Sequence, residues 1–251
     1  MVYAAVSNSH GDQLFRGAQL YGINATNGQE VWSVDGFFLA GLASADGELV
    51  GVNAYDNQLY ALGMGPSKTT VTAPDSGVTT ATSITITGTV TDLSAGSQQQ
   101  AVAANFPNGL PCVSDASESQ FMDAVYEQQP MPTNVTGVPV TIDVVDPNGN
   151  YVHLGTATTD ASGFYSFAVN TSQLGAGPGK YTVIATFPGS NSYYASYSET
   201  AFTVAPLSTA APTATPTSVA TLYFVPAVVA IIVIIIVGFA VLAVLALRKR
   251  P

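Results

Sequence analysis

Apolar and polar residues alternate along much of the chain up to Val204, as they do in half-buried β-strands. The alternation is clearest at Ile84-Thr85-Ile86-Thr87 and from Tyr181 to Phe187. Turn-forming sequences such as Asp146-Pro147-Asn148-Gly149-Asn150 separate the alternating runs. In the middle of the chain this pattern predicts seven short strands, over residues 69–72, 83–90, 138–145, 151–157, 163–169, 180–187 and 196–204.

Residues 93–132 interrupt the strand pattern between the second and third of these strands. Residues 94–109 are rich in Ser, Gln, Ala, Asn and Gly, which predicts a loop. Residues 117–129 predict an amphipathic helix, in which Ser117 and Gln120 have the spacing of a capping box. One face of this helix carries three apolar side chains, Phe121, Met122 and Val125.

The same predicted helix carries Asp123 and Glu127, one helical turn apart. Two carboxylates at this spacing share one face, so a metal-binding pair is one interpretation. A solvated helix face explains them more simply, and it is the interpretation that we favour.

Two segments of the middle region resemble the immunoglobulin-like domains of prokaryotic surface proteins. They are GTATTDASGFY at 155–165 and GKYTVIATFPG at 179–189. Seven short strands with these turns favour such a sandwich in their own right. We therefore expect an all-β chain in which residues 67–205 form an Ig-like β-sandwich with a helical insertion at about 93–132. The resemblance implies an architecture rather than an activity.

The segment from Met1 to Gly65 contains an internal repeat. Gln19-Leu20-Tyr21 recurs as Gln58-Leu59-Tyr60, and an alternating apolar segment precedes each copy. The spacing of the copies is close to the period of roughly 40 that is typical of propeller blades built from short strands. Residues 21–32, YGINATNGQEVW, resemble the blade motif of quinoprotein-type (PQQ-like) β-propellers. Asn24, Gly28 and Trp32 match that motif, whereas Gly22 and Asn27 depart from it.

The second copy of the repeat stops at Leu62, where Gly63-Met64-Gly65-Pro66 replaces the expected turn. Residues 1–65 thus predict incomplete propeller repeats of about one and a half blades, whereas propellers typically have four to eight. We expect the missing blades upstream in a longer precursor, since residues 1–6 read as a strand and not as a secretion signal. The resemblance implies that Trp32 is largely buried against the second repeat, near Phe37, Phe38 and Leu39.

Residues 222–247 form an uninterrupted run without a charge, long enough to cross a bilayer as a helix. Arg248-Lys249-Arg250 follow, so the positive-inside rule predicts an extracellular N-terminal part and a cytoplasmic tail at 248–251. Residues 206–221 are rich in Pro, Thr, Ser and Ala, which predicts an extended stalk. The expected location is therefore the cell membrane, with membrane lipid as one partner.

The charge pattern excludes nucleic acid as a partner. Arg16, Lys68 and Lys180 are the basic residues within 1–247, against 16 acidic residues, which leaves a net charge of −13. Such a body cannot neutralise a row of phosphates. Three Asn-x-Ser/Thr sequons, at Asn24, Asn134 and Asn170, are possible N-glycosylation sites and suit an extracellular domain. The expected partner of that domain is an extracellular protein or a glycan.

The sequence contains few residues in patterns typical of an active site, and we predict no catalytic, cofactor-binding or metal-ligating residue. The chain has one cysteine, Cys112, which excludes an internal disulfide and a cysteine-based zinc cluster, and its two histidines argue against a His-rich metal site. Cys112 is expected to be buried or inert, with an intermolecular disulfide as the alternative. His10 and His153 have no spaced partner, and Asp146–Asn150 offers too few carboxylates for calcium. The acidic residues of the blade region, Asp12, Asp35, Asp46 and Asp56, suit solvated turns.

The order of segments resembles that of archaeal-type cell-surface proteins with PQQ-like repeats, an Ig-like domain and a C-terminal anchor. This resemblance implies a non-catalytic surface protein that presents a propeller head on an Ig-like spacer for binding or adhesion. Two alternatives stay open: the C-terminal part of a quinoprotein-like enzyme whose active site lies in upstream blades, and a scaffold for envelope assembly.

Overall fold

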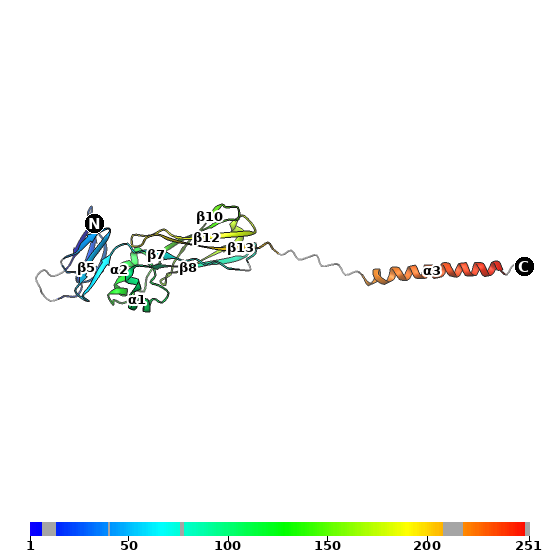
Figure 1. Ribbon diagram of the computed structural model, residues 1–251, viewed down its shortest axis with the longest axis horizontal. Helices are drawn as coiled ribbons and strands as arrows, with labels where there is room; N and C mark the ends of the chain where they lie inside the picture. Colours follow the sequence, from blue (N-terminus) through cyan, green and yellow to red (C-terminus); the bar gives the residue numbers. More distant parts are fainter. Residues whose placement is uncertain (7–13, 40, 76–77, 208–217, 249–251) are drawn as a thin grey trace. The chain divides into compact units, whose positions relative to one another are not determined.

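The computed structural model describes residues 1–6, 14–39, 41–75, 78–207 and 218–248. The chain divides into two compact units, Met1–Leu207 and Ser208–Pro251. The strands of the first unit form four antiparallel sheets, none of them closed, and the second unit contains one apolar helix (Figure 1). The chain is thus mostly all-β, as the alternation of residues predicts.

Two three-stranded sheets, which we call the N-terminal sheets, occupy the segment from Val2 to Leu62. Their strands are β1 (Val2–Ala5), β2 (Gln19–Ile23) and β3 (Glu30–Asp35), then β4 (Ala43–Ala45), β5 (Glu48–Asn53) and β6 (Gln58–Leu62). Neighbouring strands in each sheet follow one another in the chain. The sheets share a small core of three buried residues, Leu20, Phe38 and Leu49.

The middle of the chain forms two sheets around one larger core. One sheet has the order β11-β8-β7 and the other the order β10-β9-β12-β13. The strands are β7 (Ser67–Thr69), β8 (Ser83–Asp92), β9 (Pro139–Val145), β10 (Tyr151–Thr158), β11 (Phe164–Asn170), β12 (Gly179–Phe187) and β13 (Ser196–Val204). Six of the seven predicted strands are confirmed, with ends that differ by a few residues. The strand predicted at 69–72 lies earlier in the chain, as β7, and shares only Thr69 with the prediction, while Thr72 forms an isolated bridge with Thr87.

Alternation explains how these strands build the core. In β12 the side chains of Tyr181, Val183, Ala185 and Phe187 are fully buried, and the residues between them are half-buried. Ile84 and Ile86 of β8 are among the residues that the opposite sheet contributes to the same core. The linker at 63–66 already contacts the central sheets, since Gly65 forms a bridge with Tyr193. Strand β7 follows the linker directly and begins at Ser67, close to the predicted start near Lys68.

The insertion is more helical than its sequence predicts. It contains a 3₁₀ turn η1 (Ala95–Gln98), helix α1 (Gln100–Asn105) and helix α2 (Asp115–Tyr126). The prediction of a loop at 94–109 was wrong because polar residues there line an exposed helix whose one buried side chain, Val102, packs on α2. The predicted apolar face is confirmed: Phe121 is buried with Leu110 and Val113, and Met122 and Val125 pack beside it.

Helix α2 begins before the predicted cap. Ser114, in an extended conformation, is the N-cap residue, and Ser117 lies inside the first turn. The Ser117 hydroxyl accepts a hydrogen bond from the Thr136 backbone N–H at 3.0 Å, so it tethers the loop after the helix instead of capping it. The capping-box interpretation was therefore wrong.

Helix α3 (Val219–Arg248) coincides with the uncharged run. Its residues Leu222–Arg248 are long and apolar enough to cross a membrane, and none of this span is buried in protein. The part of the predicted stalk at 208–217 and the tail residues 249–251 lie outside the described residues.

Candidate functional site

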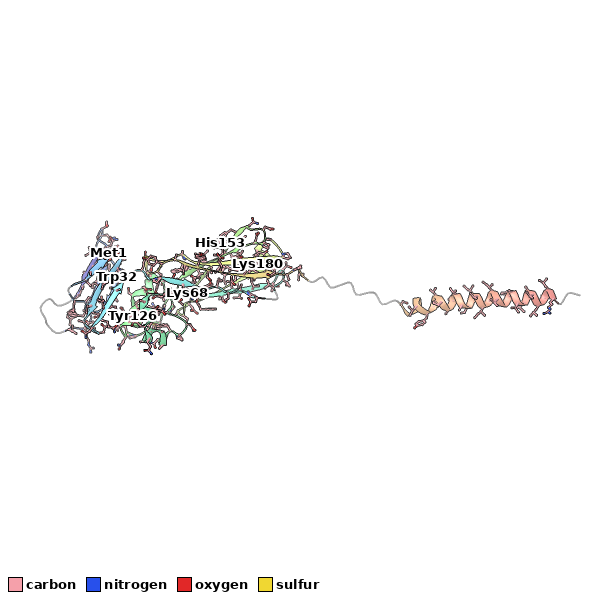
Figure 2. The ribbon with its side chains drawn as sticks, viewed as in Figure 1. Met1, Trp32, Lys68, Tyr126, His153 and Lys180 are labelled. Carbon is pink, nitrogen blue, oxygen red and sulfur yellow. The ribbon has the colours of Figure 1, made fainter. Side chains whose placement is uncertain are left out.

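Helix α2 carries carboxylates on two sides, and each side contacts a different part of the first unit. Asp123 and Glu127, near its C-terminal end, face the N-terminal sheets, whereas Asp115 and Glu118, near its start, face the loop between β12 and β13. Figure 2 labels Tyr126, the last residue of α2, and Trp32, which belongs to the N-terminal sheets. These two groups of carboxylates carry most of the shifted acid pKa values in the described residues.

Two hydrogen bonds and one close polar approach join α2 and its C-cap residue to the N-terminal sheets. The Asp35 backbone N–H donates to Asp123 Oδ1 at 3.2 Å, and Asn53 Nδ2 donates to Glu127 Oε1 at 3.3 Å. The Tyr60 hydroxyl donates to Asp56 Oδ2 at 2.7 Å and lies 3.5 Å from the Tyr126 carbonyl oxygen. We call the four acidic residues Asp35, Asp56, Asp123 and Glu127 the carboxylate joint.

Burial and mutual repulsion disfavour the charged forms of the α2 carboxylates in this joint. Burial raises the pKa of Asp123 to about 6, and the charge of Asp35 adds to the effect. Burial, followed by the charges of Asp123, Asp35 and Asp56, raises the pKa of Glu127 to about 8. Our interpretation of these two residues as a solvated helix face was wrong, because β3 and the β5–β6 region contact them and leave both side chains only partly exposed.

The other end of α2 is tied to the loop between β12 and β13. Asp115 accepts hydrogen bonds from the backbone N–H groups of Asn191 and Ser192, both at 3.1 Å, and from their side chains. Burial alone would raise the pKa of Asp115, but the bonds from Ser192 and Asn191 lower it below its usual value. This contact therefore holds the start of the helix most firmly when Asp115 is ionised.

Glu118 lies beside this contact, and its carboxyl group is more deeply buried than that of Asp115. Its Oε1 accepts from the Tyr193 hydroxyl at 3.0 Å, while its Oε2 is buried without a partner. Burial raises the pKa of Glu118 to about 8, and the charges of Asp92 and Asp115 add to the shift. Cys112 is fully buried nearby, as expected, and burial raises the pKa of its thiol. A buried neutral thiol is a poor nucleophile, so this cluster lacks an activated group.

His153 does have a partner, contrary to the sequence-based expectation. Its Nδ1 lies 2.8 Å from Asp143 Oδ1, because the two residues face each other across the β9–β10 pair. Figure 2 labels His153, whose side chain is largely exposed.

The Asp146 carboxylate accepts hydrogen bonds from Asn148 and Asn150 within its own turn. Across residues 1–6, 14–39, 41–75, 78–207 and 218–248, no three His, Cys, Asp or Glu side chains are grouped to hold a metal ion. His10 and Asp12 lie outside these ranges.

The β4–β5–β6 sheet exposes an apolar face. Residues that pair across antiparallel strands lie on the same face, and Ala43, Val50 and Ala61 pair in one row while Val52 pairs with Leu59. Leu59 is 69% exposed and Val52 39% exposed. The opposite face carries the buried residues Leu49, Gly51 and Asn53. We call Ala43, Val50, Val52, Leu59 and Ala61 the outer face of this sheet.

The blade-motif residues lie around one hairpin. The Gly28 N–H donates to the Asn24 carbonyl oxygen at 2.9 Å, and Gly28 has a positive φ of 70°. The Trp32 ring lies on Gly22, where a Cβ atom would approach the ring to 2.3 Å. The departure of Gly22 from the motif thus leaves room for the tryptophan.

Trp32 is half-buried, so the expectation of a largely buried side chain was wrong. It packs on the small core that contains Phe38, beside the ring of Tyr3 at 6.0 Å. Phe37 packs instead against Phe15 and Tyr55, and Leu39 is exposed. The ring remains partly open because Tyr3, its neighbour on the same face, is itself exposed.

Replacement of Trp32 by alanine is expected to lower the free energy of unfolding by about 2 kcal/mol, less than a fully buried tryptophan would lose. Thermal melts followed by circular dichroism would measure the loss. Val31→Ala, at an exposed position on the same strand, is the matched control and should leave the melt unchanged. A loss of zero, or one equal to that of a core tryptophan, would contradict the packing described here.

The three sequon asparagines differ in their surroundings. Asn134 is exposed in the loop that follows α2. Asn170 caps η2 (Thr171–Leu174) and accepts from the Ser172 N–H at 2.9 Å. Asn24 accepts from the Thr26 N–H at 2.9 Å. Asn134 is therefore the sequon whose side chain is least engaged in turn bonds among the three.

No protein-family model matches the chain, and no curated protein matches its sequence. A solved structure of a tetra-tandem repeat in the extending region of a large adhesion protein is similar at 18% identity, with a TM-score of 0.35. The match covers 80% of this chain and 40% of that one. The chain thus spans less than half the length of that structure, and a TM-score this low does not establish a shared fold.

Proposed function

We propose that this protein is a membrane-anchored, non-catalytic surface protein that uses its N-terminal sheets to bind an extracellular protein or glycan. The observation that carries the proposal is the outer face of the β4–β5–β6 sheet, where Leu59 and Val52 are exposed side by side. Contiguous apolar surface on a soluble unit marks a site of interaction. The apolar helix α3 supports the anchoring part of the proposal.

We also propose which structural family each pair of sheets belongs to and on which side of the membrane each segment lies. We place the N-terminal sheets among PQQ-like propeller blades, on the grounds of their sequence repeat and their meander order. The two central sheets, which share one core, would form an Ig-like spacer. In this proposal residues 1–205 are extracellular, residues 206–221 form a stalk and residues 248–251 are cytoplasmic, as in archaeal-type surface proteins.

Protease treatment of intact cells that carry the full chain tests the anchoring and its direction. A tag after Pro251 should stay attached to a protected fragment containing α3, because the bilayer shields that helix, while the β-rich unit is cleaved away. Permeabilised cells are the control, and in them the tag should be lost as well. A cleaved tag with an intact β-rich unit would reverse the orientation, and release of the chain by a carbonate wash would refute the anchor.

Vesicles carrying the full chain test the binding role. We expect them to adhere to envelope preparations from the source cells, and Leu59→Ser to reduce this adhesion at least about tenfold, an effect typical of a central apolar contact. Tyr197→Ser is the matched control, since Tyr197 on β13 is 68% exposed, close to the 69% of Leu59. Equal adhesion of both variants and the unmodified chain would refute a role for the outer face.

A further inference from the structure

We infer that the carboxylate joint is a pH-responsive latch, which holds the N-terminal sheets on helix α2 in acid and loosens them in alkali. The latch rests on the contacts within Met1–Leu207 and is independent of what the outer face binds. It would make the attachment of the N-terminal sheets to α2 depend on the pH of the surrounding medium.

The first argument is the nature of the hydrogen bonds across the joint. Neutral donors serve both α2 carboxylates: the Asp35 backbone N–H serves Asp123, and the Asn53 amide serves Glu127. Asn53 is itself held in place, since its Oδ1 accepts from the backbone N–H groups of Phe37 and Tyr55. These donors satisfy the carboxyl oxygens without neutralising any charge.

The second argument is the set of titratable groups that face the joint from each element. Strand β3 contributes Asp35, and the β5–β6 region contributes Asp56 and Tyr60. Helix α2 contributes Asp123, and its C-cap residue is Glu127. In the parts of the chain that the structure describes, no Lys or Arg forms an ion pair with these carboxylates. Full ionisation therefore places four negative charges in one contact.

The third argument is access to solvent. Asp35 and Asp123 line an open groove together with Gln120 and the loop residues Met131 and Asn134. Protons and ions can therefore reach the joint without unfolding of the sheets. The burial of Asp123 and Glu127 is partial, which allows them to titrate within the closed contact.

The direction of the pH dependence follows from the two raised values. The pKa of Asp123 is raised from its usual 3.8 to about 6, and the pKa of Glu127 is raised from its usual 4.5 to about 8. The closed joint therefore binds protons more tightly than the open one. The contribution of these groups to closure is fully present below about pH 4 and declines as the pH rises through 6 and then 8. Above that range both carboxylates are charged in the closed and the open joint.

Hydrogen exchange of the full chain in detergent micelles tests the latch. Amides of residues 30–39 and 120–128, corrected for the intrinsic pH dependence of exchange, should lose at least about tenfold in protection between pH 6 and pH 9, the factor for one pKa unit. Residues 179–187 of β12 should keep their protection. Equal protection of the joint at both pH values, or a parallel loss in β12, would overturn the latch.

Substitutions separate the joint's charges from other pH effects. Asp123→Asn combined with Glu127→Gln should keep the protection at pH 9 within about twofold of that at pH 6. Glu199→Gln, at an exposed position on β13, is the control and should behave as the unmodified chain. Asp35→Asn, which keeps the backbone donor, should move the midpoint of the loss to lower pH, because one fewer negative charge opposes ionisation of Asp123 and Glu127. An undiminished loss in the double variant or an unmoved midpoint in Asp35→Asn would overturn the proposal.

Discussion

Residues 1–65 are expected to remain unfolded when expressed alone, whereas residues 65–207 are expected to melt cooperatively. The short piece has a shared core of only three buried residues, Leu20, Phe38 and Leu49, whereas the central core contains 21. Ordering each residue costs roughly 1–2 kcal/mol in backbone entropy, which so small a core cannot offset. The short piece would also lose its contacts with α2.

Circular dichroism with thermal melting of the two pieces would check this expectation. Residues 1–207 are the reference, because they contain both the N-terminal sheets and helix α2. A cooperative melt of the 1–65 piece would show that its sheets need neither α2 nor any other part of the chain to fold. A failure of 65–207 to fold would show that the central core depends on the N-terminal sheets.

Phe187→Ala is expected to lower the free energy of unfolding of the central sheets by about 3–5 kcal/mol. Phe187 ends β12 with a fully buried side chain in the core that both central sheets share. Its removal leaves a cavity that paired strands on either side cannot close. The expected loss is a large share of the stability of an ordinary domain.

Tyr197→Ala provides the matched comparison for Phe187→Ala. Tyr197 lies on β13, one register position from the partner of Phe187, but its side chain is 68% exposed. The change should alter the free energy of unfolding by about 0.5 kcal/mol or less. Chemical denaturation would measure both variants. Similar losses in the two would contradict the assignment of faces in this sheet.

The pattern of residues by itself determined most of the secondary structure. The strands are encoded in their alternation, which depends only on neighbours along the chain, so six of the seven central strands were predicted within a few residues of their ends. Helix α3 followed from an uncharged apolar run, and the face of α2 followed from the spacing of Phe121, Met122 and Val125. In these cases the signal and the structure that it specifies lie within one segment.

One contact that was missed could have been found in the same way. Asp143 and His153 lie on either side of the turn at Asp146–Asn150. A tight turn there sets the register of β9 and β10, and that register brings the two side chains opposite each other. Pairing the predicted strands, beyond predicting each alone, would have revealed this contact between His153 and Asp143.

Only the tertiary structure decided the environment of the acidic residues of α2. Asp123 and Glu127 look like an exposed pair, since their partners Asp35 and Asn53 lie 88 and 74 residues away in the sequence. Likewise, the exposure of Trp32 depends on whether another strand covers its edge, which the hairpin motif does not specify. Burial, and with it the pKa of a carboxylate, depends on neighbours that the fold brings together from distant parts of the chain.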